Sequence, residues 1–157
     1  MTSTGSANSK ERELVIERVF DAPLEVVFDA WSKPEHLTQW FGPDRFTVPQ
    51  VNVDFRIGGS YRLCMRSPEG EDHWVWGEYR DIKPSENLVF SWNREDSEGN
   101  IWNSTVVYLT FADEGGKTRF LLRQTLFPTV EDRNDHSIGW GQCLDRLGVY
   151  LSTHSSN

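Results

Sequence analysis

The sequence predicts a soluble α+β domain in which a long C-terminal helix packs on an antiparallel sheet. Three observations lead to this prediction. Apolar residues alternate with polar ones over a series of short segments joined by turns, which is typical of strands in a meander. After Pro128 the spacing of apolar residues changes to that of an amphipathic helix. A chain of 157 residues suits one domain, and such a domain buries roughly 68–70% of its unfolded surface.

The N-terminal part predicts one strand followed by two short helices. Residues 13–20 carry apolar side chains on one parity and glutamates on the other, which indicates a strand. Asp21 is positioned to cap the next helix, and Pro23 is tolerated in its first turn. Apolar residues at helical spacing predict a helix over 24–32 and another over 35–40, which ends at a Phe-Gly-Pro sequence.

Further strands are predicted between the short helices and Pro128. Each shows period-two alternation and ends near a turn rich in Gly, Pro or polar residues. They cover about residues 48–57, 61–66, 73–82, 88–93, 104–111 and 118–127. With the first strand they make an antiparallel sheet of about seven strands, whose apolar face must be covered.

A long helix over residues 130–152 is predicted to cover that face, because no other helix is long enough. Its buried stripe is formed by Trp140, Gly141, Leu144, Leu147, Gly148 and Leu151. Each glycine costs roughly 1 kcal/mol of helix propensity relative to alanine. We therefore expect the helix to approach another element closely at its glycines.

Composition narrows the classes of function. The formal net charge of −8 argues against nucleic acid or an anionic membrane as partner, because phosphates require Lys and Arg. No apolar run reaches membrane-spanning length. Cys64 and Cys143 do not make a disulfide framework, which favours buried thiols in a reducing cytoplasm. Residues 1–12 are polar and predict a disordered leader, so we expect the domain to span residues 13–153.

Several short strings occur in the order in which a known superfamily has them. They lie at residues 18–23, 27–31, 34–37, 39–43, 54–59, 77–79 and 88–92, followed by His136, Gly139, Trp140 and the leucines of the C-terminal stripe. As an ordered set from about residue 13 to residue 151, they make the chain resemble the START-like superfamily, also known as SRPBCC or helix-grip proteins. Within it, the chain is similar to the branch named after the activator of the heat-shock protein 90 ATPase.

The resemblance implies a curved sheet and a long helix that enclose a cavity, in a superfamily that commonly binds lipids, polyketides, hormones or other apolar molecules. It therefore implies binding of a small aromatic or acyl ligand without a cofactor, with a stress-related role. The alternatives are an enzyme of the cyclase, dehydratase or hydrolase kind and a chaperone ATPase-activating module. The eukaryotic chaperone activator has an additional N-terminal domain for tight chaperone engagement, whereas about a dozen residues precede the first strand here. We therefore expect ligand binding, rather than chaperone activation, to be the function.

The strand over 73–82 carries an aromatic face. Trp74, Trp76 and Glu78 share one parity, and smaller or apolar residues occupy the other. Rings of this kind with one polar anchor are typical of ligand pockets, although they also form ordinary cores. Alternation identifies the two faces of the strand but does not say which one lines the cavity.

Two polar side chains are candidates for the cavity. Arg18 shares its parity with the apolar residues of the first strand, so we expect it to pair with a carboxylate such as Glu78, or to bind a ligand carboxylate. His136 lies one helical turn before Trp140, where it can contact a ligand, act as an acid–base group, or pack at the helix start. No nucleophile or orienting group accompanies His136, so we predict no catalytic residue.

Trp40 and Phe41 are expected to close one end of the groove, by packing there or as a mobile gate. The complete predicted ligand-binding set is Arg18, Trp40, Phe41, Tyr61, Trp74, Trp76, Glu78, Phe90, Trp92, His136, Trp140 and Leu144. The remaining histidines and the cysteines lack metal-ligand spacing, so no metal is predicted. An uncovered sheet edge could support a homodimer.

Overall fold

The computed structural model describes residues 12–95 and 101–154, so the predicted leader lies outside the described residues apart from Arg12. The elements follow the predicted order. They are β1 (Leu14–Phe20), α1 (Leu24–Ser32), α2 (Pro34–Trp40), β2 (Thr47–Val53), β3 (Ser60–Arg66), β4 (Asp72–Lys83), β5 (Asn87–Glu95), β6 (Ile101–Glu114), β7 (Lys117–Thr125) and α3 (Val130–His154).

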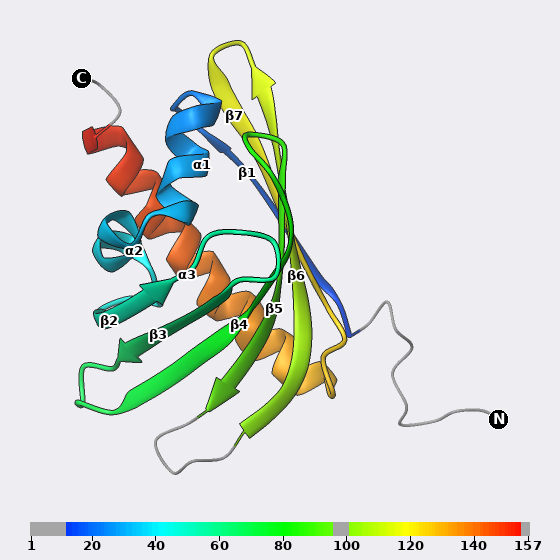
Figure 1. The fold of residues 1–157 in the computed structure, drawn as a ribbon. Helices are drawn as coiled ribbons and strands as arrows, with labels where there is room; N and C mark the ends of the chain where they lie inside the picture. Colours follow the sequence, from blue (N-terminus) through cyan, green and yellow to red (C-terminus); the bar gives the residue numbers. More distant parts are fainter. Residues whose placement is uncertain (1–11, 96–100, 155–157) are drawn as a thin grey trace, which may run out of the picture.

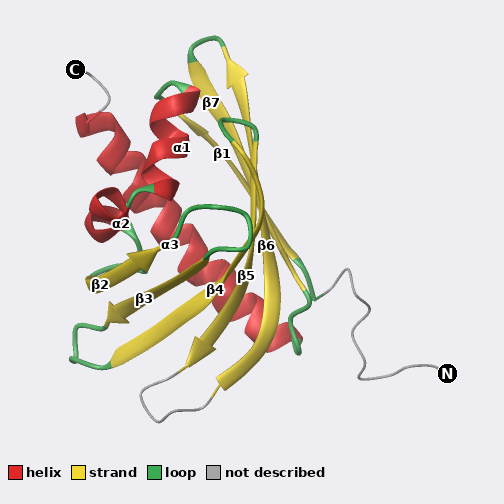
Figure 2. Ribbon diagram, viewed as in Figure 1, coloured by secondary structure: helices red, strands yellow, loops and turns green. Residues whose placement is uncertain are grey.

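The strands form one seven-stranded antiparallel sheet in the order β1-β7-β6-β5-β4-β3-β2. The first strand pairs with the last, from Leu14 opposite Gln124 to Phe20 opposite Thr118. This is because α1 and α2 carry the chain across to the opposite edge before β2 begins (Figure 1). The sheet curves, and the helices lie on its concave side, with α3 running diagonally along it (Figure 2). The predicted α+β helix-grip architecture is confirmed.

The core fills the space between the concave face and the helices. From α3, the leucines of the predicted stripe are buried, and Phe120 and Leu122 of β7 are fully buried opposite them. The ring of Trp31 in α1 stacks on Phe120, with centroids 5.5 Å apart and an interplanar angle of 14°. Trp40 in α2 meets Trp31 edge to face at 4.8 Å. The two short helices are therefore packed into the core through their aromatic residues.

Two local predictions are corrected at the ends of elements. Alternation predicts a strand to residue 57, but β2 ends at Val53 because the chain then turns back toward β3. In this turn Gly58 has φ +85°, a backbone conformation that glycine adopts without strain, and Gly59 N donates to Arg56 O at 2.8 Å. Asp21 does not cap α1, because Pro23 is the N-cap residue and no side-chain hydrogen bond caps this helix among the described residues.

The expected close approach at the glycines of α3 is wrong at Gly141. A Cβ there would have no neighbour within 4 Å outside the helix, and at Gly148 it would meet the Phe20 ring at an ordinary 3.8 Å. At Gly139, two residues before Gly141, an added Cβ would likewise lie 3.8 Å from Pro43 Cγ.

Candidate functional site

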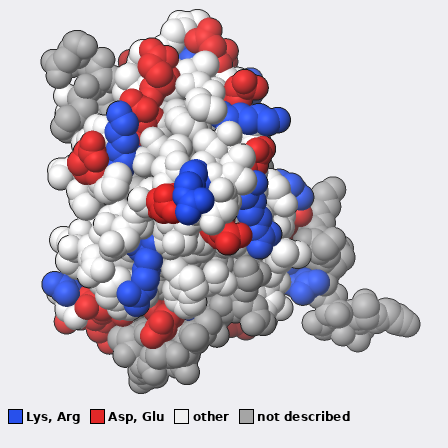
Figure 3. All heavy atoms as spheres, in the orientation of Figure 1, with Lys and Arg blue, Asp and Glu red and all other residues white. Residues whose placement is uncertain are grey.

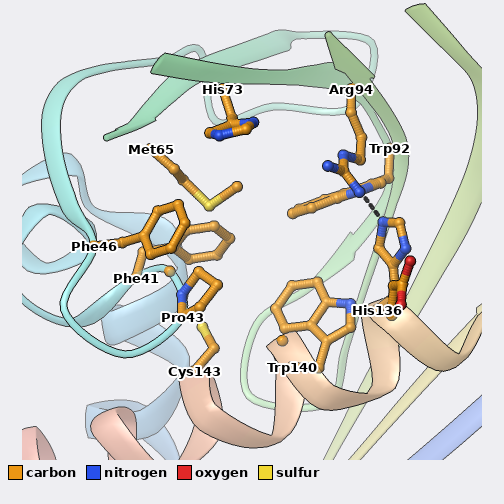
Figure 4. Close-up of a pocket in the computed structure, with 13 residues that line it drawn as sticks. Phe41, Pro43, Phe46, Met65, His73, Trp92, Arg94, His136, Trp140 and Cys143 are labelled. Carbon is orange, nitrogen blue, oxygen red and sulfur yellow. Dashed lines mark hydrogen bonds between the residues drawn. The ribbon is translucent and has the colours of Figure 1, made fainter. Parts of the chain in front are cut away.

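A pocket of about 260 Å³ lies between the first half of α3, the ends of β3, β4 and β5, and the loop that follows α2 (Figure 4). Most of its walls are apolar or aromatic. It is lined by Phe41, Gly42, Pro43, Phe46, Met65, His73, Trp92, Arg94, Asp135, His136, Gly139, Trp140 and Cys143. These side chains come from segments far apart in the sequence, which the antiparallel sheet and α3 bring to one place.

Three aromatic rings make the main wall of the pocket. The centroids of Trp92 and Trp140 lie 5.1 Å apart, tilted by 49°. Phe41 lies edge to face against Trp140 at 5.8 Å and tilted against Trp92 at 6.1 Å. Rings at these separations and angles attract one another beyond simple burial. The wall is therefore a packed aromatic cluster.

A buried chain of hydrogen bonds links the Trp140 indole to the backbone of Trp92. Trp140 Nε1 donates to Gln124 Oε1 at 2.7 Å, and Gln124 Nε2 donates to Thr105 Oγ1 at 2.8 Å. The Thr105 hydroxyl in turn donates to the backbone oxygen of Trp92 at 3.0 Å. Gln124 has no exposed surface. A buried polar chain whose members are all paired fixes the rotamers of the groups it joins, so the Trp140 ring is locked in orientation.

His136 is engaged at both ring nitrogens. Its Nδ1 lies 2.9 Å from the backbone oxygen of Asp132, and Trp92 Nε1 donates to its Nε2 at 3.3 Å. A carbonyl only accepts and an indole N–H only donates, so these partners assign the proton to Nδ1 and leave Nε2 as the acceptor. Burial lowers the pKa of His136 below its ordinary value. The imidazole is therefore neutral, and its free electron pair already accepts the hydrogen bond of Trp92.

The loop between α2 and β2 is held on α3 by a guanidinium group. Arg146 Nη1 lies 3.3, 2.9 and 2.7 Å from the backbone oxygens of Phe41, Gly42 and Pro43. Gln142 Oε1 accepts a further hydrogen bond from the backbone N–H of Asp44 at 3.1 Å. Together these bonds fix the loop that supplies one wall of the pocket.

Cys143 lies beneath this loop. Burial raises the pKa of its thiol to about 12, and a thiol with that pKa has little thiolate near neutral pH and is a poor nucleophile. Cys143 therefore serves as an apolar part of the wall.

The polar groups of the pocket are few. Arg94 and His73 are half-buried, whereas Asp135 is exposed. His73 Nδ1 is buried without a hydrogen-bond partner among the described residues. Figure 4 shows the Arg94 guanidinium beside the Trp92 ring and close to His136, with His73 across the pocket from Trp140.

The structure brings part of the predicted set to this pocket. Phe41, Trp92, His136 and Trp140 line it. Four further members are buried in the hydrophobic core outside its lining, namely Trp40, Tyr61, Phe90 and Leu144. Ligand contact itself stays a prediction for all of them.

The aromatic face of β4 points away from the pocket, which corrects the placement of Trp74, Trp76 and Glu78. The other face of β4 is the inner one, because Val75 is fully buried and Tyr79 nearly so. Trp74 instead lies on the outer surface of the sheet, with Arg62 Cζ 3.9 Å from its ring centroid. Glu78 is exposed on that same surface.

Arg18 pairs with a carboxylate other than the predicted one. Its Nη2 lies 3.6 Å from Asp145 Oδ1 of α3, and the two side chains are 34% and 75% exposed. The reason is topological, since β1 lies beside β7 while Glu78 belongs to β4, several strands away. An ion pair this exposed contributes about 0–1 kcal/mol.

Several pocket residues were missed by sequence reasoning. They are Gly42, Pro43, Phe46, Met65, His73, Arg94, Asp135, Gly139 and Cys143. Helical spacing from His136 and Trp140 could have found Gly139 and Cys143, which lie three residues further along the same face. No pattern in the sequence indicates that the Phe41–Phe46 loop folds over this end of α3.

Lys and Arg side chains are interspersed with Asp and Glu on the face shown in Figure 3, without a continuous basic area over its described residues. In the part of the chain that the structure describes, there is no group of three or more His, Cys, Asp or Glu side chains that could hold a metal ion. Of the helices described, none is both long enough and apolar enough to cross a membrane.

Comparison with known families gives one match over most of the chain. The sequence model described as Activator of Hsp90 ATPase homolog 1-like protein matches residues 21–152. No curated protein matches the chain.

Solved structures with the same fold are numerous. The chain is similar to the AHSA1 protein from Silicibacter pomeroyi, with 28% identity and a TM-score of 0.82, over 90% of this chain and 98% of that one. A protein from Rhizobium leguminosarum is 27% identical with a TM-score of 0.77, over 90% of this chain and 95% of that one. A protein from Arthrobacter aurescens, 20% identical with a TM-score of 0.81 over 94% and 90% of the two chains, supports the fold alone.

Proposed function

The chain belongs to the family of Activator of Hsp90 ATPase homolog 1-like proteins, and from this premise we propose that it binds a small apolar molecule in the pocket beside α3. The proposed ligand is an aromatic or acyl compound. The fold places a long helix against a curved sheet, and the pocket lies between α3 and the ends of β3, β4 and β5, beside Trp92 and Trp140.

The main support for the proposal is that the nitrogen atoms of the aromatic wall form hydrogen bonds within the protein. Both indole N–H groups and both nitrogens of His136 are already hydrogen-bonded inside the protein. The wall therefore offers ring faces, which an apolar ligand can contact without leaving polar atoms unpaired. Pockets for drug-sized ligands hold about 300–1,000 Å³, so one of about 260 Å³ suits a compound of one or two rings or a short acyl chain.

The arrangement favours binding over catalysis. Acid–base catalysis by His136 would require its Nε2 to release the hydrogen bond from Trp92. The other candidate groups do not converge on His136, since Glu78 is exposed on the outer face of the sheet and Arg18 pairs with Asp145. A reaction that needs these three groups around one substrate has no support from their positions.

The proposal can be tested with a matched pair of variants. Gly139→Leu adds a side chain to the pocket lining next to Pro43, at a position where the Cβ itself is accommodated. Gly141→Leu adds the same side chain to the same helix where a Cβ meets no neighbour within 4 Å. Both changes raise helix propensity similarly, so they differ mainly in whether the pocket is filled.

The probe is 2-naphthalenemethanol, an uncharged two-ring alcohol, and the readouts are tryptophan fluorescence and thermal unfolding. We expect it to stabilise the wild type and Gly141→Leu, by about 2.7 kcal/mol at 100 times its Kd, and to leave Gly139→Leu unaffected. Absence of stabilisation in the wild type near the solubility limit of the probe, or equal binding by both variants, would contradict the proposal.

A further inference from the structure

The guanidinium of Arg94 lies at one end of the pocket, and we propose that the natural ligand is an aromatic carboxylate whose anionic group binds Arg94. This inference rests on the proposed function and specifies the chemistry of the ligand. Arg94 lines the pocket beside Trp92, so a ring stacked on the indole would bring a carboxylate substituent within reach of the guanidinium (Figure 4).

The first argument concerns the chemistry of the polar groups that line the pocket. Trp92, Trp140 and His136 direct their nitrogens to partners within the protein. The Cys143 thiol is kept protonated by burial, which raises its pKa to about 12, and it is only a weak donor. The other polar side chains of the lining are Arg94, His73 and Asp135, and Arg94 is the one with a guanidinium group.

The second argument concerns the guanidinium itself. A guanidinium has five N–H donors in a planar fork that matches a carboxylate, so it can bind a ligand while keeping its other contacts. Arg94 is half-buried, which weakens solvent screening of its charge. That charge reaches the pocket wall, because it adds to burial in lowering the pKa of His136, while Asp132 and Asp135 act in the opposite direction.

His73 and Asp135 are the other two polar side chains of the lining that bear on the binding of an anion. His73 lines the same pocket, and its Nδ1 is buried without a hydrogen-bond partner among the described residues. Asp135 is negative, but it is exposed and therefore better screened than Arg94. A ligand carboxylate in the pocket would therefore meet the charge of Arg94 with less screening than that of Asp135.

The test compares two probes of nearly the same shape, 2-naphthoate and the neutral 2-naphthalenemethanol, by titration calorimetry at neutral pH and low salt. We expect the wild type to bind the carboxylate about tenfold more tightly, which corresponds to about 1.4 kcal/mol. In Arg94→Gln the ratio of the two affinities should fall to about one. In Arg62→Gln, which removes the same charge from β3 on the outer face of the sheet, the tenfold ratio should persist.

Asp135→Asn supplies a change of the opposite sign, because removing the exposed carboxylate should tighten 2-naphthoate binding and raise the ratio. If both probes bind the wild type equally, or if Arg94→Gln keeps the full ratio, the carboxylate inference is overturned while ligand binding stands. If neither probe binds, the proposed function fails, and the inference fails with it.

Discussion

The indole nitrogen of Trp92 lies 3.3 Å from Nε2 of His136, and this hydrogen bond ties β5 to the first turns of α3 at the edge of the pocket. Its donor is always protonated, whereas its acceptor exists only while the imidazole is neutral. The contact between sheet and helix therefore depends on the protonation state of one histidine.

The first prediction concerns pH. Burial lowers the pKa of His136 below its ordinary value of about 6.5, so between these two pKa values the unfolded chain binds a proton that the folded chain does not. The stability that His136 contributes is complete above about pH 6.5 and is lost as the pH falls toward the folded pKa. Urea unfolding over this range should show the wild type losing more stability than His136→Gln, in which the titrating group is absent. Parallel pH profiles for the two proteins would refute this account.

The second prediction concerns the buried chain behind the indoles. Gln124→Leu leaves the N–H of Trp140 without the acceptor it now has at 2.7 Å. A buried donor without a partner costs about 1–3 kcal/mol, so we expect the free energy of unfolding to fall by that amount in urea titrations. Gln50→Leu is the control, because Gln50 is exposed and such substitutions change stability by about 0.5 kcal/mol at most. Equal effects of both changes would mean that the chain contributes nothing to stability.

The third prediction concerns the clamp on the pocket loop. Arg146→Met removes the donor that three backbone oxygens share, and hydrogen bonds to a charged group contribute about 1.5–3 kcal/mol. We expect faster amide hydrogen exchange in residues 41–46 and weaker binding of 2-naphthalenemethanol. Arg45→Met, which removes an exposed arginine from the same loop, should change neither. Unchanged exchange in Arg146→Met would show that the loop is held by other contacts.

The fourth prediction contrasts two glycines. A Cβ at Gly77 would collide with the backbone oxygen of Ser91 and crowd the Tyr61 ring, so Gly77→Ala forces the strands apart. We expect a loss of about 1–3 kcal/mol, the usual cost of overpacking. Gly141→Ala meets no neighbour and should instead stabilise the protein by up to about 1 kcal/mol through helix propensity. Thermal unfolding of the two variants measures both effects, and a tolerated Gly77→Ala would contradict the packing described for β4.

The sequence by itself determined the architecture, because periodicity is a local property. Alternation marked each strand within a few residues of its ends, and the three- and four-residue spacing after Pro128 marked α3. The same spacing put His136 and Trp140 on one helical face, and both line the pocket. Where turn geometry intervened, as at Gly58, alternation overran the true end of the strand.

The tertiary structure alone decided which side chains meet. Alternation divides β4 into two faces, but only the position of α3 makes the face of Val75 the inner one and leaves Trp74 outside. Strand order likewise gave Arg18 a partner on α3 and separated it from Glu78. The Arg146 clamp joins α3 to backbone oxygens 103 to 105 residues away, and the hydrogen bond from Trp92 to His136 joins it to a residue 44 positions away. Such contacts depend on sheet curvature and helix packing, which no local pattern of residues encodes.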